Sequence, residues 1–170
     1  MDIRINDEKM AFKFRVNSII VKNGKVLLVT MNHNNHLCCS GGHVHIGERT
    51  DEAIIRETME EVELKPTSCR LIAIIENFFT QQATGKKFHE LSYYYIMDID
   101  KIPPEKMKDY SFLEHDEDKL VDLKFQWIPL NKLDDYNIKP IALKEILKHL
   151  DANLIQFVVA DEKIIEEKIL

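Results

Sequence analysis

Apolar and polar residues along this chain alternate with two different periods, which separate predicted strands from predicted helices. Apolar residues at every second position mark residues 12–22 as a strand, and a second apolar run follows at residues 25–29. Asn23-Gly24 lies between the two runs. An Asn-Gly pair in this position is typical of a tight turn that needs positive φ at both residues. The pattern therefore predicts a β-hairpin.

The rest of the chain reads as further strands with two helices near the end. Pro140 suits the first position of a helix. The order of elements predicts an α/β protein with a mixed sheet covered by helices. No repeat, low-complexity segment or linker divides the chain, so residues 1–170 are predicted to be a single domain. The predicted elements are strands at 69–79, 89–98, 120–128 and 154–159, an acidic loop at 110–118, and helices at 141–150 and 162–170.

A glycine-broken loop at residues 41–47 leads into an acid-rich helix, predicted to start at Thr50 or Asp51 and to end before Pro66. At about 100° per residue, Glu60 and Glu61 lie about 60° and 40° to either side of Glu57. Three carboxylates therefore share one face. The opposite face is predicted to pack on the sheet through Ile55, Thr58, Met59 and Val62.

This charge pattern disfavours the helix unless something compensates it. Like charges three or four residues apart cost on the order of a few tenths of a kcal/mol each, and anions near the C-terminal end oppose the helix dipole. Arg56 is the one cation inside the helix. A solvated acidic face is the plain alternative. A bound hard cation would relieve the repulsion, and carboxylates suit Mg²⁺ or Mn²⁺.

Composition narrows the function classes. The chain is 45% hydrophobic and 31% charged, which is typical of a globular protein. A net charge of −6 argues against binding to duplex nucleic acid. No apolar run reaches membrane-spanning length, and the polar N-terminus lacks a signal-peptide core. Cys38, Cys39 and Cys69 cannot all pair, so we expect reduced thiols and a cytoplasmic protein.

The central stretch resembles the Nudix box, the signature of a family of nucleoside-diphosphate-X hydrolases. Gly42 is followed after five residues by Glu48 and after seven more by Arg56-Glu57, and then come Glu60-Glu61 and Leu64. Three positions depart from the pattern. Thr58 replaces an aliphatic residue, Glu63 replaces a glycine that normally takes a left-handed conformation at the helix end, and Ser40 replaces a proline. We expect any local difference from the family's geometry first at Glu63.

The resemblance extends more weakly beyond the box, to the hairpin before it, to His89 and to the segment from Trp127 to Leu130. It implies an α/β/α sandwich around a mixed sheet. It also implies metal-dependent attack of water on phosphorus, which cleaves the pyrophosphate linkage of a nucleoside diphosphate joined to another moiety. The ligands of Mg²⁺ or Mn²⁺ would be Glu57, Glu60, Glu61 and the carbonyl of Gly41. Glu48 and Arg56 would support them, with Arg56 orienting a glutamate by a salt bridge.

Several roles stay open. The first choice for the general base is Glu61, with Glu114 and Glu117 of the acidic loop as alternatives. His89 is a candidate for a phosphate contact, Glu114 for a substrate contact, and Glu90 faces either the cleft or solvent. Trp127 is interpreted as a core residue. One of Phe78 and Phe79 is expected in the core and the other at a pocket.

Two other functions compete with a hydrolase. A structural zinc site would use a cluster of soft ligands, and a non-catalytic Nudix-like domain would bind a nucleotide as a sensor. The substrate is open among nucleoside triphosphates, ADP-ribose and similar small nucleotides. A homodimer is possible through the apolar tail at residues 154–159. The cluster of soft ligands comprises His33, His36, Cys38, Cys39, His43 and His45.

Overall fold

The protein is built on two β-sheets that share the space between two helical layers. The structure, a computed structural model, describes residues 1–32, 34–116 and 119–170. The larger sheet is mixed, because β2 pairs with β6 and β5 with β9 in parallel, whereas its other neighbours are antiparallel. Its order is β1 (Arg4–Asn6), β2 (Met10–Ile19), β6 (Lys87–Asp98), β5 (Ser68–Thr80), β9 (Ile155–Ala160) and β10 (Lys163–Ile169).

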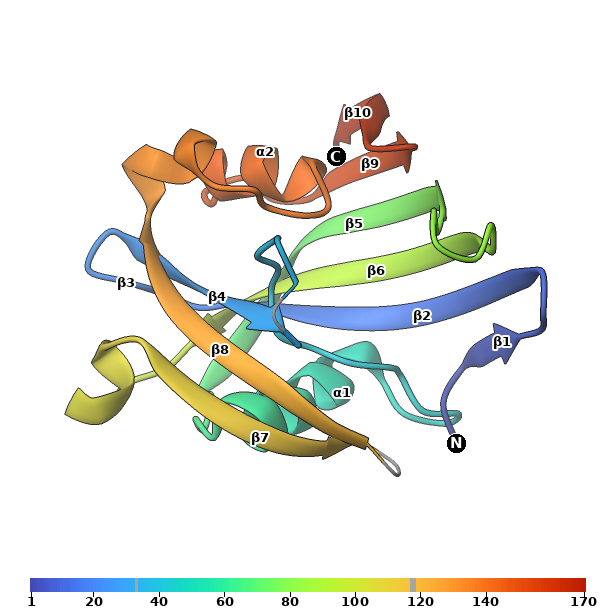
Figure 1. Ribbon diagram of the computed structural model, residues 1–170. Helices are drawn as coiled ribbons and strands as arrows, with labels where there is room; N and C mark the ends of the chain where they lie inside the picture. The colour runs from blue at the N-terminus through green and yellow to red at the C-terminus, as the bar shows by residue number, and fades with distance from the viewer. Residues whose placement is uncertain (33, 117–118) are drawn as a thin grey trace.

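The smaller sheet is antiparallel and lies across one end of the larger one (Figure 1). Its order is β3 (Val21–Lys22), β4 (Lys25–Met31), β8 (Lys119–Pro129) and β7 (Tyr110–Asp116). The hairpin prediction is confirmed, since β3 pairs with β4 and the turn residues Asn23 and Gly24 have φ of 51° and 70°.

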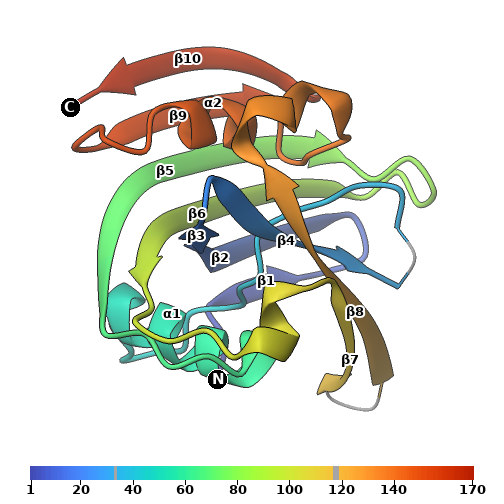
Figure 2. The same ribbon diagram turned by 90° about the vertical axis from the view of Figure 1, so that its left-hand side faces the viewer.

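Two helical layers enclose the sheets, as Figures 1 and 2 show. On one side lies α1 (Thr50–Glu57), continued by the π-turn η1 (Thr58–Val62). On the other lies α2 (Ala142–Lys148), preceded by the 3₁₀ segment η3 (Leu130–Asp135). Each layer has its own core, which includes Ile54 and Val62 beneath α1 and Leu143 beneath α2. The predicted α/β/α sandwich is therefore confirmed.

Two predicted elements are wrong in type. The expected acidic loop at 110–118 contains β7, which pairs with β8 from Tyr110↔Phe125 onward. The expected helix at 162–170 is β10, which returns antiparallel to β9 after a turn at Asp161 and Glu162, both with positive φ. Charged residues in short segments obscured the strand pattern, and in both cases a long neighbouring strand supplied the hydrogen bonds.

The apolar tail was interpreted as a dimer surface, but its residues lie inside the sheet. β9 has β5 on one edge and β10 on the other, and Ile155, Phe157 and Val159 are buried. Trp127 is also buried, as expected of a core residue, and its indole Nε1 donates to the carbonyl of Lys106 at 2.7 Å. Within the described ranges, no helix is both long and apolar enough to cross a lipid bilayer.

Candidate active site

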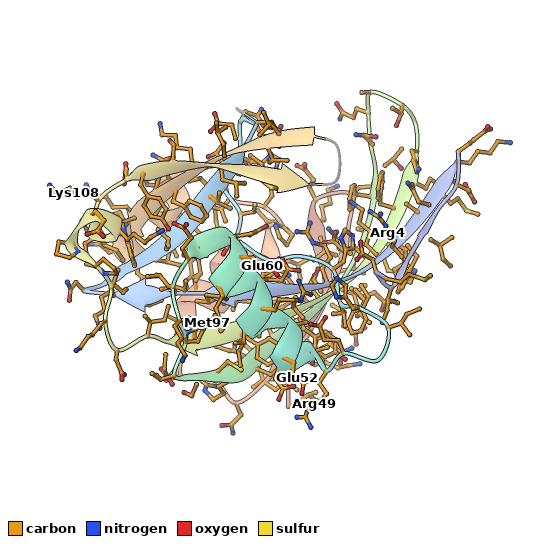
Figure 3. All side chains as sticks on the ribbon, turned by 90° about the horizontal axis from the view of Figure 1, so that it is seen from below. Arg4, Arg49, Glu52, Glu60, Met97 and Lys108 are labelled. Atoms are coloured by element: carbon orange, nitrogen blue, oxygen red, sulfur yellow. The ribbon has the colours of Figure 1, made fainter. Side chains whose placement is uncertain are left out.

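The acid-rich helix begins at Thr50, one of the two predicted starts. Its N-cap is Arg49, whose backbone N–H donates to the Glu52 carboxylate at 3.2 Å. Thr50 is not the cap, because its hydroxyl is paired with the hydroxyl of Tyr95 at 2.7 Å on the adjoining sheet. Figure 3 shows Arg49 and Glu52 together at the helix entrance, with Glu60 further along.

The second half of the helix widens into a π-turn. Thr58 and Val62 are buried as predicted, but Met59 is 48% exposed, so its assignment to the packing face was wrong. Ile54 is buried, as are Glu57 and Glu61. The helix therefore packs through the side that carries these two carboxylates and not through the opposite side, and Met59 points away from it.

Two of the three carboxylates lie against the glycine loop. Glu57 and Glu61 are each only 9% exposed, whereas Glu60 remains exposed. The backbone N–H of Gly41 donates to Glu61 Oε2 at 2.8 Å. Gly42 touches Glu57 so closely that a Cβ there would lie 2.4 Å from its carboxylate. Burial raises the pKa of Glu57, an effect that Arg56 opposes.

Arg56 joins the loop to the helix through most of its donors. Its Nε and Nη2 bind the two oxygens of Glu48 at 2.8 and 3.0 Å, and Nη2 also donates to the carbonyl of His43 at 3.1 Å. Its Nη1 donates to Glu57 at 2.5 Å and to Glu60 at 3.1 Å. The pKa of Arg56 is raised, chiefly by its hydrogen bonds to Glu48. The expected salt bridge between Arg56 and a glutamate is therefore present.

The oxygen atoms at this site have the chemistry of ligands for a hard divalent cation. Three carboxylates and the carbonyl of Gly41 are oxygen ligands of the kind that Mg²⁺ and Mn²⁺ prefer. Across the described residues, however, no group of three or more His, Cys, Asp or Glu side chains is gathered closely enough to hold a metal. Arg56 lies between Glu57 and Glu60 and carries a compensating positive charge. The ligand set accordingly stays a prediction.

The helix exit keeps a left-handed residue although the usual glycine is absent. Glu63 has φ 55° and ψ 35°. The Nζ of Lys106, in the 3₁₀ segment η2 (Pro104–Met107), donates at 2.8 Å both to the Glu63 carboxylate and to the carbonyl of Val62. It also lies 4.6 Å from the centre of the Tyr110 ring. Lys106 therefore caps the helix and compensates the departure at Glu63.

A cavity of about 810 Å³ lies on the sheet face opposite α1, where β2, β6 and β5 meet the start of α2. Its wall combines amide and aromatic side chains with charged ones. Glu90 lies on it, so this side chain faces the cleft and not the solvent. Phe79 also lines it, whereas Phe78 is 38% exposed, so neither phenylalanine belongs to the core. Its polar and aromatic lining includes Asn17, Asn35, Asn77, Phe79, Gln81, Tyr94 and Asn137.

Arg15 connects this cavity to the glycine loop. It lies on β2, lines the cavity, and donates from Nη2 to the carbonyl of Gly41 at 2.7 Å. Burial lowers the pKa of Arg15, but the charge of Glu90 and its other neighbours raises it overall. Gly41 is wedged against the sheet, since a Cβ there would lie 2.0 Å from the Val16 carbonyl oxygen. The loop is therefore held from the sheet side as well as from the helix side.

Other predicted residues lie apart from this arrangement. His89 bonds Glu76 at 2.9 Å and stacks on Phe78, on the sheet face away from the cavity. The Glu114 side chain and Glu117 lie outside the part of the chain that the structure describes, and so does His33 of the zinc alternative. Among the described soft ligands, no group of three is gathered as that alternative requires, and Cys38, Cys39 and Cys69 are free thiols.

Sequence reasoning missed Arg15 and Asn17. They alternate with Phe14 and Val16 along β2. Such alternation usually indicates a strand with one buried face and one face in solvent. The only sequence signal was an Arg and an Asn in a strand otherwise rich in apolar residues. Loops at residues 35–39 and 137–141 cover this face and turn the polar positions inward.

Comparison with known proteins agrees with the architecture. An ADP-ribose pyrophosphatase from Methanocaldococcus jannaschii is 31% identical over 87 residues, which are 49% of this chain and 49% of that protein. The chain thus aligns with about half the length of this curated relative. A MutT protein from Bacillus halodurans has a TM-score of 0.59 at 18% identity, covering 92% of this chain and 96% of its own.

A second solved structure, a MutT NUDIX hydrolase from Burkholderia pseudomallei, has a TM-score of 0.57 at 18% identity and covers 81% of this chain and 96% of its own. At such identities the likeness concerns the fold. The model of the NUDIX domain family matches residues 13–150, which include the glycine loop, the acid-rich helix and most of the cavity wall. This chain therefore belongs to the NUDIX domain family.

Proposed function

We propose that the protein hydrolyses the pyrophosphate linkage of a nucleoside diphosphate joined to another moiety, with a divalent metal ion. The observation that carries the proposal is the junction at Gly41. Its N–H binds Glu61 of the acid-rich helix, and its carbonyl binds Arg15 on the cavity wall. A molecule in the cavity can therefore place its phosphates beside the carboxylates.

Glu57, Glu60 and Glu61 would hold the metal, together with the Gly41 carbonyl. A bound Mg²⁺ or Mn²⁺ neutralises phosphate oxygens and lowers the pKa of water. Glu61 is the proposed general base, because it is nearly buried and fixed by Gly41 at the end of the helix nearest the cavity wall. Glu48 contributes by fixing Arg56, which in turn orients Glu57 and Glu60.

The cavity suits the neutral part of a nucleotide. Its volume of about 810 Å³ is that of a small-molecule site. Amide groups can read hydrogen-bonding edges, and Phe79 and Tyr94 offer aromatic contact area. Asp161 also lines the cavity, and its negative charge disfavours phosphate beside it. The candidates are nucleoside triphosphates, ADP-ribose and similar compounds. ADP-ribose is the first to test, because the curated relative is called an ADP-ribose pyrophosphatase.

The test is a panel of nucleoside-diphosphate compounds incubated with Mg²⁺, with Mn²⁺ and with a chelator, scored by the nucleotide or phosphate released. We expect cleavage of at least one member that stops with the chelator and in Glu61→Gln. Tight binding without turnover across the panel would instead support the sensor alternative. Three free thiols support a reducing compartment such as the cytoplasm, and the acidic net charge supports small nucleotides over duplex nucleic acid.

A further inference from the structure

Two polar side chains of β2 face the cavity together. Arg15 and Asn17 are two residues apart, so they lie on the same face of the strand, and both line the cavity. The cavity's other strong cation, Lys139, is paired with Glu162. Among the described residues, Arg15 makes no direct salt bridge, so its charge is open to a ligand in the cavity.

Both side chains carry a buried donor without a partner. Within the described residues, neither Arg15 Nε nor Asn17 Nδ2 has a hydrogen-bond acceptor, and Asn17 is only 6% exposed. Buried polar groups in native proteins are almost always bonded, so an orphan pair on one wall calls for an explanation. A bound molecule that offers oxygen acceptors at this point supplies one.

The position of Arg15 selects the kind of acceptor. Its guanidinium is linked to Glu61 through a single residue, Gly41, whose carbonyl accepts from Arg15 at 2.7 Å and whose N–H donates to Glu61 at 2.8 Å. Gly41 cannot move toward the sheet, because Val16 blocks it. A group that contacts Arg15 therefore lies next to the carboxylates of the acid-rich helix. A guanidinium binds phosphate through paired N–H donors, and an amide N–H can add a third.

We propose that Arg15 and Asn17 bind the phosphate group of the substrate that lies on the cavity side of the cleaved linkage. The assignment rests on the proposed function, since it takes the substrate to be a pyrophosphate compound. Glu90 lies on the same wall, with one oxygen bound by the Ser92 hydroxyl at 3.0 Å. Its negative charge opposes the anion, so it sets how tightly the phosphate is held.

The test measures by calorimetry the affinity of the whole protein for methylenediphosphonate at saturating Mg²⁺. This compound is an analogue of pyrophosphate that cannot be hydrolysed. Arg15→Met should weaken binding by about tenfold or more, since a charge-assisted pair is lost, and Arg15→Lys should fall between it and the native protein. Asn17→Ala should weaken binding by about threefold, the effect of one neutral hydrogen bond. Glu90→Gln should strengthen it.

Lys139→Met is the matched control, because it removes the other cation of the same cavity. It should leave the affinity for methylenediphosphonate within about twofold, since its charge is already paired. The unphosphorylated nucleoside of the best substrate should bind Arg15→Met as it binds the native protein. Circular dichroism and thermal melting check each fold, and Asn17→Ala and Glu90→Gln carry the test if Arg15→Met does not fold.

The proposal is overturned if native protein does not bind the phosphonate, or if binding is unchanged in Arg15→Met or in its substitutes. It is also overturned if nucleoside affinity falls equally, which would mean a collapsed cavity. Binding needs no turnover, so the proposed function fails separately. Absence of hydrolysis with these binding shifts intact would remove the reaction and keep the phosphate site.

Discussion

Two arginines hold the same glycine loop from opposite sides, and they are used differently. Arg56, on the helix side, bonds Glu48, Glu57, Glu60 and the carbonyl of His43. Arg15, on the sheet side, bonds the carbonyl of Gly41 and keeps a buried donor unpaired. A saturated guanidinium fixes a structure, whereas an unsaturated one beside a cavity is available to a ligand. The contrast separates the support of the site from its binding surface.

The largest expected effect comes from Glu61, the carboxylate that Gly41 links to Arg15. Glu61→Gln should lower kcat by about 10³-fold, because the residue loses its charge and basicity while a Gln oxygen can still accept from Gly41. The melting temperature should stay close to that of the native protein. Glu105→Gln, an exposed charge change on η2, is the control and should be silent. Full activity in Glu61→Gln would remove Glu61 from the chemistry.

The loop itself can be broken in graded steps with alanine at three glycines. In Gly41→Ala the Cβ meets backbone at 2.0 Å, so we expect a loss of about 3–5 kcal/mol of unfolding free energy. In Gly42→Ala it meets the movable Glu57 carboxylate, so activity should fall more than stability. Gly47→Ala has open space but φ 84°, and should cost about 1 kcal/mol.

Urea unfolding and the hydrolysis rate measure these three variants side by side. The ranking depends on which atoms surround each glycine, since backbone cannot yield and a side chain can. An equal loss of stability in all three would show that the loop is not held against the sheet and the helix as described.

Replacing each arginine by lysine sharpens the contrast directly. Arg56→Lys loses the two-point contact with Glu48, so it should reduce unfolding free energy by about 2 kcal/mol. Arg15→Lys gives up one hydrogen bond, to the Gly41 carbonyl, and should reduce the unfolding free energy by less than about 1 kcal/mol. Chemical denaturation of both variants measures the two losses of unfolding free energy. A larger stability loss for Arg15→Lys would reverse the assignment of support and binding.

The smallest effect is expected at the helix exit. Lys106→Met should cost about 1 kcal/mol, because a helix carbonyl and the Glu63 carboxylate lose their shared donor. Glu63→Gly should recover most of this loss in the double variant, since glycine takes the left-handed conformation freely. Lys108→Met is the control, an exposed lysine two residues on (Figure 3). No recovery in the double variant would mean that Lys106 acts elsewhere.

Local sequence was enough to predict the hairpin at Asn23-Gly24 and the acid-rich helix, and the resemblance to the Nudix box implied the salt bridge of Arg56. These depend on residues close in the chain, where turn chemistry, helical spacing and charge are readable. The replacement of the family's glycine by Glu63 predicted a local difference at the helix exit, and this was wrong, because Glu63 keeps the left-handed conformation.

Tertiary structure alone decided the rest. The strands β7 and β10 form because β8 and β9 offer edges, and Met59 faces outward because the helix packs through the side that carries Glu57 and Glu61. Arg15, Asn17 and Glu90 face a cavity only because loops and α2 cover that face of the sheet. Alternation along a strand tells which residues share a face, but not what lies opposite that face.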